Sequence, residues 1–124
     1  MWNRILILIL SFATLFSAAA AARTRRGAAR PFVATAFVQS GPTKSGLPAQ
    51  RGIVAADPRV LPIGTQIEVR SAGPYSGIYI VADSGPAIRG RRIDIFVPSR
   101  LRARQFGRKR VLVRVIRWGS AQNG

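Results

Sequence analysis

An internal repeat at a spacing of 26 positions constrains the fold of this chain more than any other feature. In the repeat, Ala56-Asp57 matches Ala82-Asp83, Gly64 matches Gly90, and the stretch Ile67 to Val69 matches Ile93 to Ile95. Each copy ends one apolar run on an aspartate, crosses through a glycine, and starts a second apolar run that carries an acid. Because neither copy can bury its apolar face alone, we expect the two to close around a pseudo-twofold axis into one barrel.

The other apolar runs predict six short strands and one short helix. Runs rich in strand-forming residues, separated by Gly and Pro turns, are typical of a small barrel. The expected strands are residues 32–38, 52–56, 66–70, 78–82, 93–97 and 111–118. The expected helix spans residues 99–106, with Ser99 as its N-cap and Gly107 at its end. The predicted fold class is all-β, a six-stranded double-psi β-barrel with one short helix.

The N-terminal residues 1–22 have the pattern of a signal peptide. A short positive start precedes an almost wholly apolar stretch and then a run of small residues that ends at Ala22. The alternative is a membrane anchor, but the apolar core is shorter than the roughly 20 residues that a span needs. Cleavage after Ala22 would leave a basic arm (23–31), the barrel (32–118) and a tail (119–124). We predict that the protein is exported, either to the periplasm or out of the cell, and that it keeps no stable membrane anchor after cleavage.

The charge of the chain predicts an anionic partner. The sequence has 20 basic and 4 acidic residues, a formal net charge of +16, and such a field attracts polyanions. The basic residues lack the interleaved aromatic pattern of single-strand readers, and an exported protein rarely meets nucleic acid, so we expect no physiological nucleic acid. Peptidoglycan, with its carboxylated peptides, fits the compartment better. A monomer is the default expectation, and packing alone must hold the exported domain because cysteine is absent.

Any acid–base chemistry must come from four residues, because the chain has no His and no Cys. They are Asp57, Glu68, Asp83 and Asp94. The central stretch from Ile80 to Val97 places Asp83 and Asp94 on neighbouring strand ends, joined across Gly85 and Pro86 by a turn that only Gly permits. Four scattered acids make no dedicated metal site, and we expect no metal or other cofactor.

Several ordered blocks of this sequence resemble the three-aspartate (3D) domain family. They are Ala55-Ala56-Asp57-Pro58, Leu61 to Thr65, Asp83-Ser84-Gly85, Ala87 to Gly90, Arg92 to Phe96 and Phe106-Gly107, within a match from about Thr35 to Trp118. The family is related to the C-terminal barrel of membrane-bound lytic transglycosylase A. The resemblance implies a double-psi barrel that cleaves peptidoglycan glycan strands without water and leaves a 1,6-anhydro-muramic acid end. Two departures from the family are Pro86, where a second small residue is usual, and the absence of a separate glycan-gripping domain.

The resemblance assigns the catalytic acid to Asp94 and a supporting role to Asp83. One carboxyl can serve as acid and then base, because the 6-hydroxyl of the sugar itself attacks. Exclusion of water and a nearby Asp83 would raise the pKa of Asp94, whereas the arginines at 89, 91 and 92 would lower it. The expected substrate-binding residues are Thr35, by resemblance, Thr43 and Ser45, by loop character, and Asp57 and Gly85.

Two other interpretations of the chain remain open. It could be a wall-binding, expansin-like module without turnover, or a basic binder of polyanions. In the first case the aspartates would be structural: Asp57 would cap a turn before Pro58, Asp83 would hold backbone amides of the Gly85 turn, and Asp94 would pair with arginine.

Overall fold

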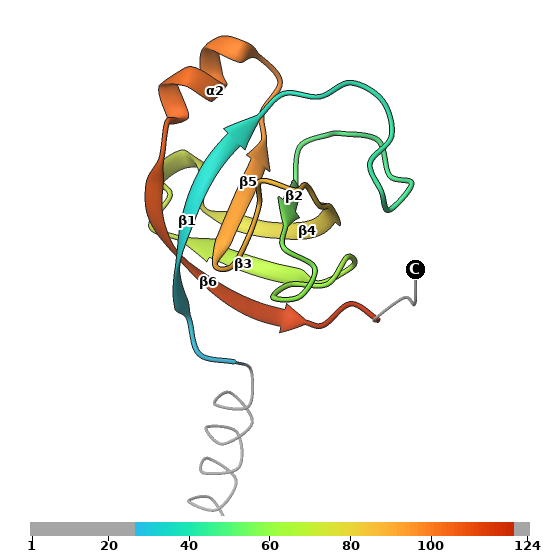
Figure 1. Ribbon diagram of the computed structural model, residues 1–124. Helices are drawn as coiled ribbons and strands as arrows, with labels where there is room; N and C mark the ends of the chain where they lie inside the picture. Colours follow the sequence, from blue (N-terminus) through green and yellow to red (C-terminus); the bar gives the residue numbers. More distant parts are fainter. Residues whose placement is uncertain (1–26, 121–124) are drawn as a thin grey trace, which may run out of the picture.

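The computed structural model describes residues 27–120, which form a closed six-stranded barrel (Figure 1). The strands are β1 (Arg30–Phe37), β2 (Ile53–Ala56), β3 (Gln66–Arg70), β4 (Gly77–Asp83), β5 (Arg92–Phe96) and β6 (Lys109–Arg117). The helices are the 3-10 helix η1 (Gly73–Tyr75) and the α-helix α2 (Arg100–Phe106). Every expected strand and the expected helix is present, with ends shifted by at most two residues, so the predicted all-β barrel is confirmed. The predicted signal peptide, residues 23–26 of the arm and most of the tail lie outside the described residues.

The strand order agrees with the internal repeat. Around the barrel the order is β1-β5-β2-β4-β3-β6, with parallel pairs β1–β5 and β2–β4 and antiparallel pairs elsewhere. The first strands of the two copies, β2 and β4, are neighbours. Each pairs on its other edge with the second strand of the other copy: β2 with β5, and β4 with β3. The matched glycines Gly64 and Gly90 both adopt positive φ, at 93° and 69°, a conformation that L side chains rarely take.

The register of the strands does not repeat. Asp94 of β5 lies opposite Ala55, whereas its counterpart Glu68 of β3 lies opposite Ile78. Under an exact twofold relation Glu68 would instead oppose Val81, the counterpart of Ala55. The two acids therefore meet different neighbours, and only one of them can have the surroundings of Asp94.

Alternation along the strands fills the barrel with apolar side chains. Val54, Ala56, Ile93 and Ile95 belong to the buried core, so Asp94, between the last two, points away from it. The helix α2 covers the end of the barrel towards which β1 and β5 run (Figure 1), and its Phe106 is buried in the core.

The helix α2 begins and ends where the sequence predicts. The Ser99 side chain accepts a hydrogen bond from the Arg102 amide at 3.2 Å, and Gly107 follows the helix with φ 64°. Between residues 27 and 120, no helix has the length and apolar character needed to cross a membrane.

Candidate active site

Asp94 and Thr35 form a hydrogen-bonded pair on the outer face of the barrel. They are direct partners in the parallel register of β1 and β5, and the Thr35 hydroxyl donates to Asp94 Oδ1 at 2.9 Å. Both side chains are half-buried. The structure thus brings together the predicted catalytic acid and one predicted substrate-binding residue.

Burial raises the pKa of Asp94 above its ordinary value. The hydrogen bond from Thr35 and, after it, the positive charge of Arg92 act in the opposite direction, and burial prevails. The ion pair with arginine that the non-catalytic interpretation implied is not formed: within residues 27–120, none of the ion pairs involves Asp94. A carboxyl that stays protonated to higher pH is what a general acid requires.

Arg92 is a member of this site that the sequence interpretation treated only as a nearby charge. Its Nη2 donates to the Thr35 hydroxyl at 3.4 Å, and its Nη1 donates to the Ala87 carbonyl at 3.3 Å. Arg92 and Asp94 are two positions apart on β5, so strand alternation already places them on one face. That alternation was the signal that could have identified the contact.

Asp83 lies on the same row of the sheet as Asp94, but not next to it. Ala55 of β2 opposes Asp94 on one side and Asp83 on the other. Since neighbouring strands are about 4.8 Å apart, the two aspartate backbones are roughly 10 Å apart. Burial, one of the two predicted causes, raises the pKa of Asp94, and Asp83 is not among the groups that shift it.

Asp83 instead fastens a loop to the end of β4. Its buried carboxylate oxygen Oδ1 accepts from the Ser84 amide at 2.9 Å and from the Lys44 amide at 3.3 Å. The Ser45 amide adds a bond to the Ala82 carbonyl at 3.0 Å. The expectation that Asp83 holds amides of the Gly85 turn is met by the Ser84 amide, and the second partner, the Lys44 amide, comes from the loop between β1 and β2.

The loop residues Thr43 and Ser45 lie close to Asp83, but Thr43 is buried and Ser45 is exposed. Thr43 is buried, and its hydroxyl donates to the Leu47 carbonyl at 2.8 Å and lies 2.9 Å from Ser45 Oγ. Ser45 is exposed, as is Lys44, whose Nζ donates to Ser84 Oγ at 2.9 Å. Lys44 and Ser45 therefore present polar groups to solvent, whereas Thr43 shapes the loop from within.

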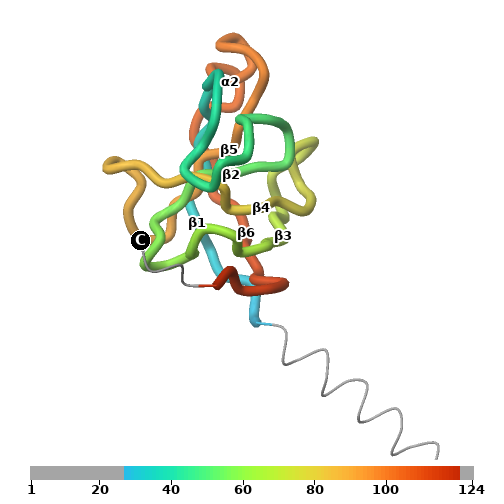
Figure 2. Tube along the Cα trace, turned by 90° about the vertical axis from the view of Figure 1, so that its right-hand side faces the viewer, coloured from blue at the N-terminus to red at the C-terminus, as the bar shows by residue number. Residues whose placement is uncertain are grey.

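The crossing between β4 and β5 requires glycine at Gly90 and not at Gly85, where the sequence predicted the glycine turn. Gly85 does not have positive φ, and a Cβ there would make ordinary contact with Ile88 at 3.5 Å. The turn that favours glycine is at Gly90, with φ 69°. Pro86 and Ala87 are exposed, and Figure 2 shows this crossing standing out from the barrel.

Asp57 sits in a turn after β2, with both carboxylate oxygens occupied. It accepts from the amide, Nε and Nη2 of Arg59 at 3.0, 3.1 and 3.0 Å, and from the Gly90 amide at 2.9 Å. The side-chain bond from Arg59, followed by the backbone bonds, holds the pKa of Asp57 well below its usual range. These contacts agree with the turn-capping interpretation, and the role of Asp57 in substrate binding stays a prediction.

The fourth acid, Glu68, forms ion pairs with Arg70 and Arg114. Across residues 27–120, no three His, Cys, Asp or Glu side chains gather closely enough to hold a metal ion. Asp94, with Thr35 and Arg92, is thus the acid whose surroundings favour proton transfer.

The sequence of this chain matches a known protein family. The family model described as the 3D domain matches residues 52–117, slightly more than half of the sequence. The chain belongs to the 3D domain family. Its candidate acid Asp94 and the loop-fastening residue Asp83 both lie within the matched 3D domain.

Two curated relatives of this 3D domain protein come from Bacillus subtilis (strain 168). The cell wall-binding protein YocH is 37% identical over 81 residues, which cover 62% of this chain and 27% of YocH. The putative cell wall shaping protein YabE is 35% identical over 81 residues, covering 62% of this chain and 19% of YabE. The chain thus spans about a quarter or less of the length of these proteins.

Among solved structures, the barrel is similar to the E. coli lytic transglycosylase MltA. One MltA structure superposes with a TM-score of 0.53 at 22% identity, covering 62% of this chain and 27% of MltA. A second gives a TM-score of 0.53 at 20% identity over 65% of this chain and 28% of MltA. At this identity the likeness establishes the shared fold.

Proposed function

We propose that this 3D domain acts on bacterial cell-wall peptidoglycan and cleaves its glycan strands as a lytic transglycosylase, with Asp94 as the acid. The observation that carries the proposal is the half-buried carboxyl of Asp94, whose pKa is raised by burial while Thr35 holds it in place. Membership of the 3D domain family and the fold shared with MltA support the same reaction class.

The proposed reaction needs one carboxyl and no water. Protonated Asp94 donates its proton to the oxygen that joins two sugars, and the bond from that oxygen to the anomeric carbon breaks. The 6-hydroxyl of the same muramic acid ring attacks the anomeric carbon, and the Asp94 carboxylate accepts the hydroxyl proton. The products are a 1,6-anhydro ring and a new free end, and Asp94 is again protonated.

The neighbouring residues serve this step by position and charge. The Thr35 hydroxyl donates to Asp94 and accepts from Arg92, so it holds the carboxyl when it becomes negative. Ser45 and Lys44 offer exposed polar groups to the sugar, and Asp83 keeps their loop against β4. In this proposal Thr43 and Gly85 act through the shape of the loop and the crossing.

We place this reaction in the cell envelope or outside the cell. The support is the signal-peptide pattern of residues 1–22 and the cell-wall names of YocH and YabE. N-terminal sequencing of the exported protein should read Arg23 or a close neighbour. An intact Met1 in the membrane fraction would indicate an anchor instead.

A wall-binding module without turnover is the second candidate function. The observation that favours it is the 37% identity with YocH, whose name describes cell-wall binding. Digestion of purified sacculi followed by mass spectrometry separates the two functions. Anhydro-muropeptides indicate cleavage, and sedimentation with sacculi without any product indicates binding alone. If moderate salt releases all the protein and no product forms, a general polyanion binder is indicated.

A further inference from the structure

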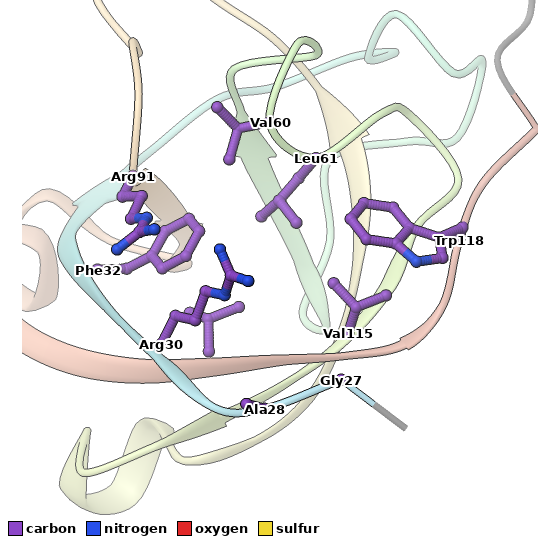
Figure 3. Close-up of a pocket in the computed structure, with 10 residues that line it drawn as sticks. Gly27, Ala28, Arg30, Phe32, Val60, Leu61, Arg91, Val115 and Trp118 are labelled. Carbon is purple, nitrogen blue, oxygen red and sulfur yellow. The ribbon is translucent and has the colours of Figure 1, made fainter. Parts of the chain in front are cut away.

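A hollow opens at the end of the barrel opposite α2. Its volume is about 220 Å³, and it lies where β1 and β5 start and β6 ends. Among the residues that line it are Arg30, Phe32, Leu61, Arg91, Val115 and Trp118. Figure 3 shows the Trp118 indole on one side, beside Leu61 and Val115, and the two guanidinium groups on the other, beside Phe32.

Trp118 is an exposed side chain on a fixed backbone. Its place at the end of the last apolar run predicts a role in packing, but its exposed fraction is 62%, so that prediction is wrong. The next residue, Gly119, donates its amide to the buried Thr65 hydroxyl at 3.0 Å. A Cβ on Gly119 would lie 2.4 Å from the Ile63 carbonyl oxygen, so the chain is pressed against this turn. A broad aromatic surface held this way binds a ligand at low entropic cost.

Arg30 and Arg91 give the opposite side of the hollow a charge that no acid balances. Both residues are exposed, and within residues 27–120 neither forms an ion pair. An adjoining hollow of about 340 Å³ shares Phe32 and Arg91 and adds Arg110. The planar guanidinium group matches a carboxylate with two parallel hydrogen bonds, so the charge favours a carboxylate ligand.

Asp57 joins two walls of this hollow. Its carboxylate accepts from the Gly90 amide, next to Arg91, and its carbonyl accepts from the Leu61 amide at 2.8 Å. Asp57 thereby fixes the spacing between the arginine side and the apolar side. It is a positioning residue for the hollow.

We propose that this hollow is a second binding site for a carboxylate-bearing wall fragment, of which a part about the size of one sugar ring enters the hollow. The sugar or the apolar part of the peptide would lie against Trp118, and the carboxylate would meet Arg30 and Arg91. The choice of a wall fragment rests on the proposed function. Arg91 precedes Asp94 by three residues on the chain, so their backbones are roughly 10 Å apart at about 3.3 Å per residue. One polymer segment can thus reach both, and the hollow would add grip on the polymer beside the proposed acid.

Titration with muramyl dipeptide tests this site, using the full chain with Trp2→Phe so that Trp118 is the sole tryptophan. We expect saturable binding with a change in Trp118 fluorescence. Esterification of the probe's carboxylate should weaken binding about 10-fold, as expected for the loss of charge-assisted hydrogen bonds. The free dipeptide and glucuronic acid, titrated in parallel, show whether the peptide or a carboxylated sugar is the recognised part. Absence of saturation, or equal binding of acid and ester, would overturn the proposal.

Matched arginine variants show whether the hollow, and not the general charge, holds the ligand. Calorimetry should show about 5- to 10-fold weaker binding for Arg91→Gln and unchanged binding for Arg104→Gln, on α2 at the far end of the barrel. Equal losses in both variants would contradict the proposal, provided that thermal melts show both folded.

Asp94→Asn separates this site from the proposed cleavage. The variant should bind muramyl dipeptide with unchanged affinity. Binding without cleavage in the unmodified protein would leave the second site standing and remove the proposed reaction. Cleavage of sacculi without binding of muramyl dipeptide would support the proposed reaction and overturn the second site.

Discussion

At Asp94, burial and hydrogen bonding act on one carboxyl in opposite directions. Burial favours the protonated form, and the Thr35 hydroxyl and the charge of Arg92 favour the carboxylate. Burial outweighs the other two, so the residue remains an acid at higher pH than a free aspartate. Asp57 shows the opposite balance, because bonds from Arg59 and Gly90 outweigh its burial.

Replacing Thr35 by Val should raise the pKa of Asp94 further. The variant keeps the shape of the side chain but removes the hydrogen bond that favours the carboxylate. A carboxyl-detected NMR titration measures the change, with the Asp57 resonance in the same spectra as an internal control. A lowered or unchanged pKa of Asp94 would show that the hydroxyl does not act on it as described.

Replacing Asp94 by Asn should leave the fold as stable or more stable at pH 7. The folded pKa of Asp94 lies above its ordinary value of 3.8, so the native state binds more protons than the unfolded state between the two values. Stability therefore falls as pH rises through that window, and the amide removes this loss. Thermal melts should show that the variant is more stable than the unmodified protein at pH 7, and that the two do not differ in this way at pH 3. A variant that is much less stable at pH 7 would contradict this sign.

At the scale of elements, the strands were predictable and their register was not. Runs of β-branched residues bounded by Gly and Pro identify β3 and β5 closely, because these signals are local. That Ala55 lies between Asp94 and Asp83 depends on pairing between distant strands, which the barrel closure decides. The same limit explains why Asp83 was assigned to its own turn when one of its partners is Lys44.

The N-cap of α2 gives a prediction for one element. Ser99→Ala removes the side-chain acceptor of the Arg102 amide and should cost about 1 kcal/mol of stability. Urea unfolding measures the loss, with Ser40→Ala, in the exposed loop after β1, as the matched control. Equal midpoints for the two variants would mean that the cap does not stabilise the helix.

The loop between β1 and β2 should loosen when Asp83 is removed. Asp83→Ala leaves the amides of Lys44 and Ser84 without their acceptor, and bonds to a charged group contribute about 1.5–3 kcal/mol. Asp83→Asn keeps an Oδ1 acceptor and should cost less. Hydrogen exchange at the Lys44 amide, read beside thermal melts, should speed up most in the alanine variant. Unchanged exchange there would separate the loop from Asp83.

At the scale of the whole molecule, the two ends of the barrel differ. The helix α2 covers one end, while the other holds the hollow with Trp118, Arg30 and Arg91. The sequence predicted the basic charge and the anionic partner, but not where the charge would gather. The end of an apolar run predicts packing for Trp118, but the side chain is exposed, and the next residue, Gly119, bonds to the Thr65 hydroxyl, which is distant in sequence.

In the proposed reaction Asp94 is the acid that cleaves glycan strands without water. The most direct measurement is mass spectrometry of purified sacculi after digestion with the unmodified protein, Asp94→Asn and Glu68→Gln. Glu68 is the counterpart of Asp94 in the internal repeat and is held in ion pairs, so it is the matched control. We predict anhydro-muropeptides from the unmodified protein and from Glu68→Gln, and a loss of at least about 100-fold from Asp94→Asn, the scale of general acid catalysis. Anhydro-muropeptides at an undiminished rate from Asp94→Asn would contradict the assignment.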